Sequence, residues 1–193
     1  MTKNLVIMGP PGAGKGTHAK EIAAHFNIPW ISTGDIFRKH KAEKTELGKL
    51  IESYIDKGEF VPDSVTDRIV CERISQTDAT AGFLLDGYPR SIPQAKVLKA
   101  VLAETNERVD AAIYLDVSAA EVERRLLKRA EIEGRTDDTP EVIEHRLEVF
   151  FTATRPLLDY YEQEGVLRKV DGEGTISEIA QRLLTVMEEI EGK

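Results

Sequence analysis

Short apolar runs alternate with longer amphipathic stretches along this chain. The apolar runs lie at residues 5–8, 29–31, 83–85, 111–115 and 166–170. A strand that is buried on both faces of a parallel sheet has such a run, and the helical stretches between runs supply the crossover connections. The pattern therefore predicts an α/β fold in which five strands form one largely parallel sheet.

Signals for helix ends support this division. Ser118 and Thr175 each lie three residues before a glutamate, as in a capping box, and the Thr-Pro pair at 139–140 is typical of a helix start. Pro156 interrupts a helical pattern over residues 140–164. We expect it to kink or divide that helix just before its own position.

Two stretches interrupt the alternation of strands and helices. Residues 33–61 form a charged excursion with candidate helices near 35–41 and 46–57, and residues 131–138 form a short polar segment. In a parallel sheet that binds its ligand at the carboxyl ends of the strands, such excursions can close over the site as lids. They can equally be surface connectors, and composition does not separate the two interpretations.

Length and charge limit the classes of protein to consider. The chain has 193 residues, which suits one domain with small inserts, and its net charge is −8 with a pI near 5.2. This acidic balance argues against bulk binding to nucleic acid or to an anionic membrane. Any site for a polyanion must therefore be a local cationic pocket.

Cysteine usage and hydropathy bear on the compartment. Cys71 is the only cysteine, so neither a disulfide nor a four-cysteine zinc site can form within the chain. The first residues lack the long apolar segment of a secretory signal, and no apolar run is long enough to span a bilayer. We expect a cytoplasmic protein without membrane or nucleic-acid partners.

A glycine-rich loop follows the first apolar run and leads into a helical pattern. Residues 9–17, GPPGAGKGT, have the Gly-x4-Gly-Lys spacing of a phosphate loop, in which backbone N–H groups and a helix N-terminus hold phosphate. Gly16 stands where the general pattern has Ser or Thr, and the hydroxyl comes one place later, at Thr17. The loop predicts a nucleoside triphosphate site with Lys15 on a terminal phosphate; the alternative is a turn with a surface lysine.

Two further patterns carry candidate chemistry. Asp86 ends the third apolar run, and a strand-end carboxylate beside a phosphate loop can hold Mg²⁺, with Thr17 as a second candidate; the alternative is a turn cap. Helical spacing over residues 121–129 places Arg125 and Arg129 along one flank of an apolar stripe. It places Arg124 and Lys128 nearly opposite the stripe, where they are expected to face solvent.

Three motifs together resemble the adenylate kinase family of nucleoside monophosphate kinases. They are GPPGAGKGT, then ISTGD followed by Arg38, then DGYPR followed by Gln94. The resemblance covers nearly the whole chain and implies a single core domain over residues 1–193, with a three-layer fold of the P-loop NTPase type. It also implies a monophosphate-binding lid at residues 33–61 and a short donor lid at residues 130–138.

For ATP, the resemblance implies contacts from the glycine-rich loop, from the arginine-bearing helix and from the end of the last strand. These residues are Gly12, Ala13, Gly14, Lys15, Gly16, Thr17, Arg125, Arg129 and Gly172. Arg125 is expected over the adenine ring and Arg129 near the phosphates, because a guanidinium stacks on a purine and binds phosphate oxygens.

For AMP, the resemblance implies contacts from the first lid, from the DGYPR segment and from the second lid with the helix after it. These residues are Thr33, Arg38, Ile55, Val61, Gly87, Arg90, Gln94, Arg135 and Arg146. Thr33 and Gln94 are expected to read adenine, and Arg38 and Arg90 to grip the phosphate. Gln94 has an alternative role as the capping-box partner of Ser91.

The implied catalytic set is Lys15, Arg90, Arg129, Arg135 and Arg146. Mg²⁺ is expected with ATP, and zinc is not expected, because the second lid is too short for the zinc-bearing form of some relatives. His18 stands where the family usually has glutamine, and we expect it to pack and not to react.

The expected reaction is the reversible transfer of the terminal phosphoryl group of ATP to AMP, giving two ADP, in a monomer. A UMP/CMP kinase is the alternative within the enzyme class, although those relatives tend to have alanine at the position of Thr33 and asparagine near that of Gln94. A nucleotide-dependent binding module is the more distant alternative, but it has no need of a second cationic pocket such as Arg38 and Arg90 predict.

Overall fold

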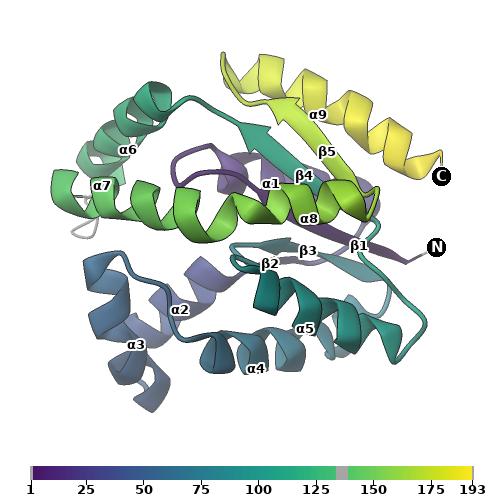
Figure 1. Cartoon of the computed structure of the whole chain (residues 1–193), viewed down its shortest axis with the longest axis horizontal. Helices are drawn as coiled ribbons and strands as arrows, with labels where there is room; N and C mark the ends of the chain where they lie inside the picture. Colours follow the sequence, from purple (N-terminus) through teal and green to yellow (C-terminus); the bar gives the residue numbers. More distant parts are fainter. Residues whose placement is uncertain (1, 134–138, 193) are drawn as a thin grey trace.

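The fold is built on one parallel sheet. The computed structural model describes residues 2–133 and 139–192, and for residues 129–133 it describes only the helical backbone. Five strands lie in the order β2-β3-β1-β4-β5, and each neighbouring pair is parallel (Figure 1). They are β1 (Lys3–Met8), β2 (Trp30–Ser32), β3 (Gly82–Asp86), β4 (Ala111–Asp116) and β5 (Leu167–Asp171). Each overlaps one of the apolar runs, so the predicted fold class is confirmed.

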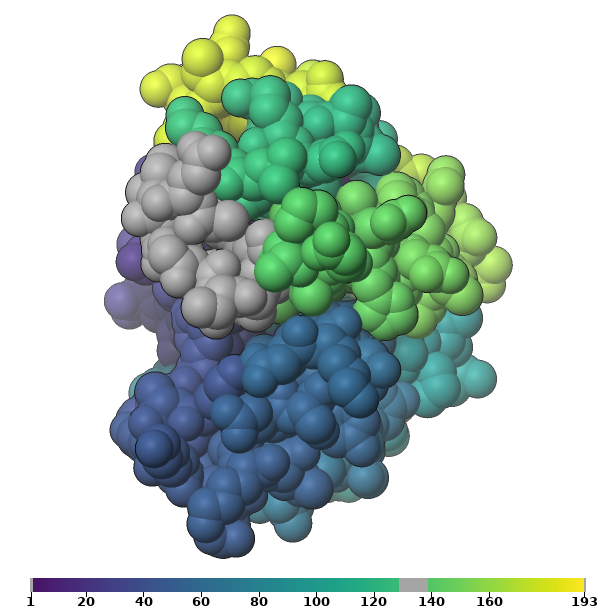
Figure 2. All heavy atoms as spheres, turned by 90° about the vertical axis from the view of Figure 1, so that its left-hand side faces the viewer, coloured from purple at the N-terminus to yellow at the C-terminus, as the bar shows by residue number. Residues whose placement is uncertain are grey.

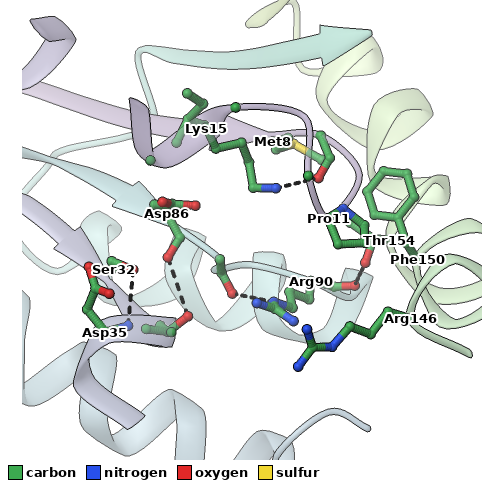
Figure 3. Close-up of a pocket in the computed structure, with 18 of the residues that line it drawn as sticks. Met8, Pro11, Lys15, Ser32, Asp35, Asp86, Arg90, Arg146, Phe150 and Thr154 are labelled. Carbon is green, nitrogen blue, oxygen red and sulfur yellow. Dashed lines mark hydrogen bonds between the residues drawn. The ribbon is translucent and has the colours of Figure 1, made fainter. Parts of the chain in front are cut away.

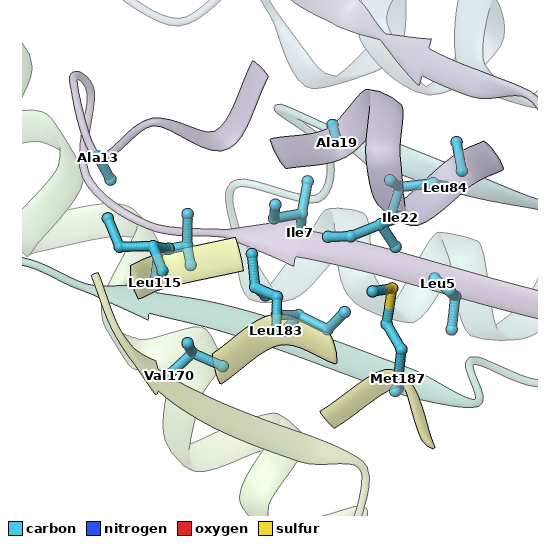
Figure 4. Packing of buried hydrophobic residues seen from close by; sticks show 14 of the residues in the cluster. Leu5, Ile7, Ala13, Ala19, Ile22, Leu84, Leu115, Val170, Leu183 and Met187 are labelled. Carbon is cyan, nitrogen blue, oxygen red and sulfur yellow. The ribbon is translucent and has the colours of Figure 1, made fainter. Parts of the chain in front are cut away.

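Helices cover both faces of the sheet. Those on one face are α1 (Lys15–Phe26) and α9 (Ile176–Glu191); those on the other are α4 (Asp63–Ile74), α5 (Ile92–Ala103) and α8 (Pro156–Gln163). Side chains along β1 alternate between the two resulting cores. Leu5 and Ile7 join the cluster under α1 and α9 (Figure 4), whereas Val6 and Met8 join the cluster on the other face. This alternation produces the helix–sheet–helix layers that the resemblance implied.

The remaining elements extend from the carboxyl edge of the sheet or connect its layers. They are α2 (Thr33–Ala42), α3 (Glu46–Lys57), the 3₁₀ turn η1 (Thr77–Ala79), α6 (Ala119–Glu133), α7 (Pro140–Val149) and the π turn η2 (Phe150–Thr154).

The excursion at residues 33–61 has a small core of its own. Phe37, Ile51 and Val61 form a buried cluster that is separate from the two clusters on the sheet. Helix α3 is capped by Gly58, whose φ of 74° is left-handed. A Cβ at Gly58 would lie 2.9 Å from Arg146 and 3.1 Å from Val142 of α7. Figure 2 shows α3 (blue) against α7 (green) on this face of the molecule.

Most of the predicted helix ends are confirmed. Thr175 and Glu178 form a capping box, Thr139 accepts a hydrogen bond from the Val142 N–H, and α8 begins at Pro156 after the π turn. The capping box predicted at Ser118 is wrong, because Ser118 and Glu121 each have another partner.

The Ser118 N–H donates to the carboxylate of Glu173 at 3.0 Å. Glu121, its expected partner, accepts from Arg124 and Arg125 at 2.7 Å each. Charge-assisted bonds to two guanidinium groups outweigh a single bond to a backbone N–H.

Truncation of Ile51 to alanine tests whether residues 33–61 unfold as a unit. We expect the loss of about 2–4 kcal/mol that large-to-small core changes produce, confined to α2 and α3, because Ile51 is 0% exposed and belongs to that small core. Hydrogen exchange should accelerate in these helices and stay unchanged in β1 and β4.

Ile113→Ala in the sheet core is the matched control, and it should lower the stability of the whole molecule. Equal loss of protection across the sheet in Ile51→Ala would show that the excursion is not a separate unit.

Candidate functional site

A large cleft opens at the carboxyl ends of β1, β2 and β3. Its volume is ≈ 990 Å³, and its walls come from the glycine-rich loop, the start of α2, the end of α3, residues 86–94, α6 and α7. The carboxyl ends of the strands in a parallel sheet meet at one edge, and ligands of open α/β sheets bind there. The register places Ile7 and Ser32 on either side of Asp86.

The glycine-rich loop forms one wall of the cleft. Gly14 has a left-handed φ of 92° and lies at the N-cap of α1, so the chain turns sharply into the helix at Lys15. The first N–H groups of a helix have no partner within it and attract anions. The Lys15 ammonium donates to the carbonyl oxygens of Gly9 at 2.8 Å and Pro10 at 2.9 Å, which holds it over the loop (Figure 3).

Arg125 is fixed at the outer end of the loop. Its Nη1 donates to the carbonyl oxygen of Ala13 at 3.3 Å, and its Nη2 donates to that of Gly172 at 3.0 Å. Hydrogen bonds from Arg124 and Arg125 lower the pKa of Glu121 to about 2. Arg125 is among the described residues that line the cleft, whereas Ala13 and Gly172 are not. The backbone carbonyl groups of Ala13 and Gly172 therefore position the guanidinium from outside the cleft.

A second group of cations faces the loop across the cleft. Arg90 Nε donates to the Gly87 carbonyl oxygen at 2.8 Å, and the guanidinium lies 5.0 Å from the ring centre of Phe60. Burial lowers the pKa of Arg90, and the positive charges of Arg146 and Arg38 lower that pKa further, while Asp86 opposes them. Figure 3 shows Arg90 and Arg146 extending into the same space. Like charges held this close form a site for an anion.

Asp86 lies between the two groups of cations. It is 8% exposed, and burial raises the pKa of its carboxyl group, with Lys15 and Arg90 acting in the opposite direction. A buried carboxylate whose charge is only partly compensated suits an oxygen-binding cation such as Mg²⁺. Among the described residues, no three His, Cys, Asp or Glu side chains gather in a metal-binding cluster.

The residues implied to form the adenine pocket line the cleft. Thr33 is 1% exposed and its hydroxyl donates to the Asp86 carbonyl oxygen at 3.4 Å; Ile55, Val61 and Gln94 are also lining residues. Of the two hydrogen bonds that would make Gln94 the capping-box partner of Ser91, one is present. Its backbone N–H donates to the Ser91 hydroxyl, but its side chain does not complete the capping box.

Other predicted residues have mixed outcomes. Arg124 is 64% exposed and Lys128 is also exposed, as helical spacing predicted, although both reach the rim of the cleft. His18 is 1% exposed and burial lowers its pKa, which agrees with a packing role. The Arg129 side chain and Arg135, together with most of the segment 130–138, lie outside the described residues.

Some residues of the site were missed in the sequence. Phe60 lies under Arg90, and Trp30 lines the cleft with the Lys20 ammonium 5.6 Å from its ring centre. Asp63 holds the side chain of Gln94. In the sequence, Asp63 follows Pro62 and looks like an ordinary acidic residue at a helix start, so nothing there indicates its contact with Gln94.

The chain is similar to known proteins over nearly its whole length. The family model described as "Adenylate kinase" matches residues 7–166. A protein of Nocardioides sp. named adenylate kinase is 49% identical over 186 residues, covering 96% of this chain and 97% of its own. Adenylate kinases of Micrococcus luteus and Thermobifida fusca are 51% and 47% identical, and each alignment covers at least 93% of this chain and 88% of the relative. In the part of the chain that the structure describes, no helix is long and apolar enough to cross a membrane.

Replacement of Asp86 by asparagine should stabilise the protein without ligand at pH 7. The folded-state pKa of Asp86 lies above its unfolded value, so ionisation weakens the fold as the pH rises through that window. Asp86→Asn removes this penalty. Its thermal midpoint should exceed that of the wild type at pH 7, and the gain should shrink as the pH falls toward the unfolded value of ~3.9.

Asp116→Asn, at the exposed end of β4, is the matched control and should change stability by less than about 0.5 kcal/mol. A lower midpoint for Asp86→Asn at pH 7 would mean that the pairing of Asp86 with Lys15 and Arg90 outweighs its burial.

Proposed function

Because this chain belongs to the adenylate kinase family, we propose that its cleft holds ATP and AMP at the same time. The phosphate groups of the two nucleotides face each other. The reaction is the reversible transfer of the terminal phosphoryl group of ATP to AMP, which gives two ADP. An oxygen of the AMP phosphate attacks the terminal phosphorus of ATP as the bond to the bridging oxygen breaks, and that oxygen leaves on ADP.

One observation carries this proposal: two separate groups of cations face each other across one cleft. Lys15 and the first turn of α1 form the first group, and Arg38, Arg90 and Arg146 form the second. A module that binds a single nucleotide needs only the first group. Two polyanions that must be brought into contact need both, because their mutual repulsion is the main obstacle to the reaction.

The donor nucleotide occupies the loop side. Gly12 and residues 14–17, which line the cleft, surround its phosphates. Lys15 neutralises the terminal groups, and Arg125 covers the adenine ring beside the backbone of Gly172. Arg129 and Arg135 complete the catalytic set around the phosphoryl group in transit. Because a guanidinium at such a position is worth about 10³-fold or more in rate, each is a major contributor.

The acceptor occupies the opposite side. Arg38, Arg90 and Arg146 bind its phosphate. Gly87 allows the backbone to pass close to Thr33, because a Cβ at Gly87 would lie 2.6 Å from the Thr33 hydroxyl. Thr33 and Gln94 read adenine, and Ile55 and Val61 close the pocket for the base.

Asp86 would hold Mg²⁺ through water, with the Thr17 hydroxyl as the second candidate, and both residues line the cleft. The bound ion would neutralise charge on the phosphates of ATP. Residues 33–61 and 130–138 act as lids that exclude water before transfer. A monomeric state and a cytoplasmic location stay predictions.

A panel of monophosphates tests the acceptor. ATP consumption by the purified protein should depend on AMP and yield ADP in a two-to-one ratio to AMP consumed, with UMP and CMP much poorer. Strong stimulation by UMP and none by AMP would identify a UMP kinase. ATP hydrolysis that is indifferent to every monophosphate would contradict the transferase.

Two arginine variants should separate the donor and acceptor sites. Because each hydrogen-bonded charge is worth roughly 1.5–3 kcal/mol, Arg38→Ala should raise the KM for AMP by about 10- to 100-fold and leave that for ATP nearly unchanged. Arg125→Ala should do the reverse. The control is Arg124→Ala on the same helix, whose exposed guanidinium should matter less than twofold, by the small worth of exposed ion pairs. If both test variants impair both nucleotides equally, the division of the cleft is wrong.

A further inference from the structure

The amide of Gln94 is held on both sides. Its Oε1 accepts from the backbone N–H of Arg90 at 2.7 Å, and its Nε2 donates to Asp63 Oδ1 at 2.7 Å. The residue is 2% exposed and lines the cleft. The side chain therefore has one conformation in which both of its polar atoms are satisfied.

These two partners also determine which way round the amide lies. The Arg90 N–H can only donate, and an ionised carboxylate can only accept. A flipped amide would place its NH₂ group against the Arg90 N–H and its oxygen against the Asp63 carboxylate. Both contacts would then be repulsive, and two buried groups would lose their partners.

Asp63 is itself fixed by its neighbours. Its Oδ2 accepts from the Ser91 hydroxyl at 3.2 Å, and that hydroxyl accepts from the Gln94 N–H at 3.4 Å. Asp63 begins α4 two residues after Val61, which closes the pocket for the base. Asp63, Ser91 and Gln94 thus form a closed ring of hydrogen bonds, and of these three residues Gln94 alone lines the cleft.

Each polar atom of the Gln94 amide can form one further hydrogen bond. The nitrogen has a second N–H and the oxygen a second lone pair, in an order that Asp63 and Arg90 determine. Adenine presents an acceptor at N1 and a donor at N6, which matches this order. Hypoxanthine and guanine present a donor at N1 and an acceptor at O6, and uracil is reversed in the same way at N3 and O4. Cytosine has the adenine order.

We propose that Asp63 is a positioning residue that sets base selectivity: by fixing the amide of Gln94, it makes the acceptor site accept adenine and reject hypoxanthine, guanine and uracil. The inference rests on the proposed function, in which the base of AMP lies against Gln94. It adds a residue that does not touch the nucleotide and acts through one that does.

AMP and IMP provide the sharpest comparison, because they differ only at the edge that the amide would read. The wild type should prefer AMP strongly in kcat/KM with ATP as donor. In Asp63→Ala the amide keeps only the Arg90 anchor, so the AMP-to-IMP ratio should fall about tenfold, mainly through KM, with kcat for AMP changed less than about twofold. Asp63→Asn can still accept from Gln94 through its amide oxygen, and it should retain most of the preference.

The effect must pass through Gln94. In Gln94→Ala the AMP-to-IMP ratio should already be low, and addition of Asp63→Ala should not lower it further. Asp78→Ala, which removes an exposed ion pair with Arg73 near the C-terminal end of the same helix, is the matched control and should leave the ratio unchanged. If Asp63→Ala folds poorly, Asp63→Ser keeps a polar side chain at the first position of α4 but is too short to reach Gln94, and it should show the same fall in the ratio.

Equal losses for AMP and IMP in Asp63→Ala, or a further fall of the ratio in the Gln94→Ala background, would overturn the proposal. A wild type that consumes no ATP in response to AMP would instead refute the proposed function, and the two failures are thus distinguishable.

Discussion

Repulsion among like charges is the constraint on which this site depends. The chain carries a net charge of −8, yet one cleft gathers Lys15, Arg38, Arg90, Arg125 and Arg146. Three of them are held by backbone carbonyl oxygens: Lys15 by Gly9 and Pro10, Arg90 by Gly87, and Arg125 by Ala13 and Gly172. A carbonyl orients a cation without neutralising it, so the positive potential stays available to phosphate. Arg38 and Arg125 also have carboxylate partners, Asp35 and Glu121, at the more exposed margin.

Those carbonyl groups are placed by the sheet. β1 ends at Met8, just before the glycine-rich loop; β3 ends at Asp86, just before Gly87; and β5 ends at Asp171, just before Gly172. Because all of the strands run in the same direction, these ends meet at one edge. The register of the sheet therefore sets the spacing of the charges. The two cores that clamp the sheet from either side determine the site as directly as the residues that line it.

The fold was predictable to the extent that it depends on local patterns. The apolar runs located every strand, and the caps at Thr139 and Thr175 were correct because their partners lie within three residues. The cap at Ser118 failed because Glu121 has stronger partners in two arginines, and spacing does not show that competition. In the site, the loop and the arginines follow from motifs. The bond between Asp63 and Gln94 joins residues 31 positions apart, and it becomes visible only when α4 and α5 pack together.

Trp30 has a consequence for how this molecule can be observed. It is the only tryptophan of the chain, and it is a half-buried wall residue of the cleft with the Lys20 ammonium over its ring. Excitation at the long-wavelength edge of protein absorption therefore excites Trp30 alone. Its emission reports local hydration and charge at the carboxyl edge of the sheet, against a background that contains no second indole. Nucleotide binding and the exclusion of water from the cleft should therefore change the fluorescence of Trp30 in the unlabelled protein.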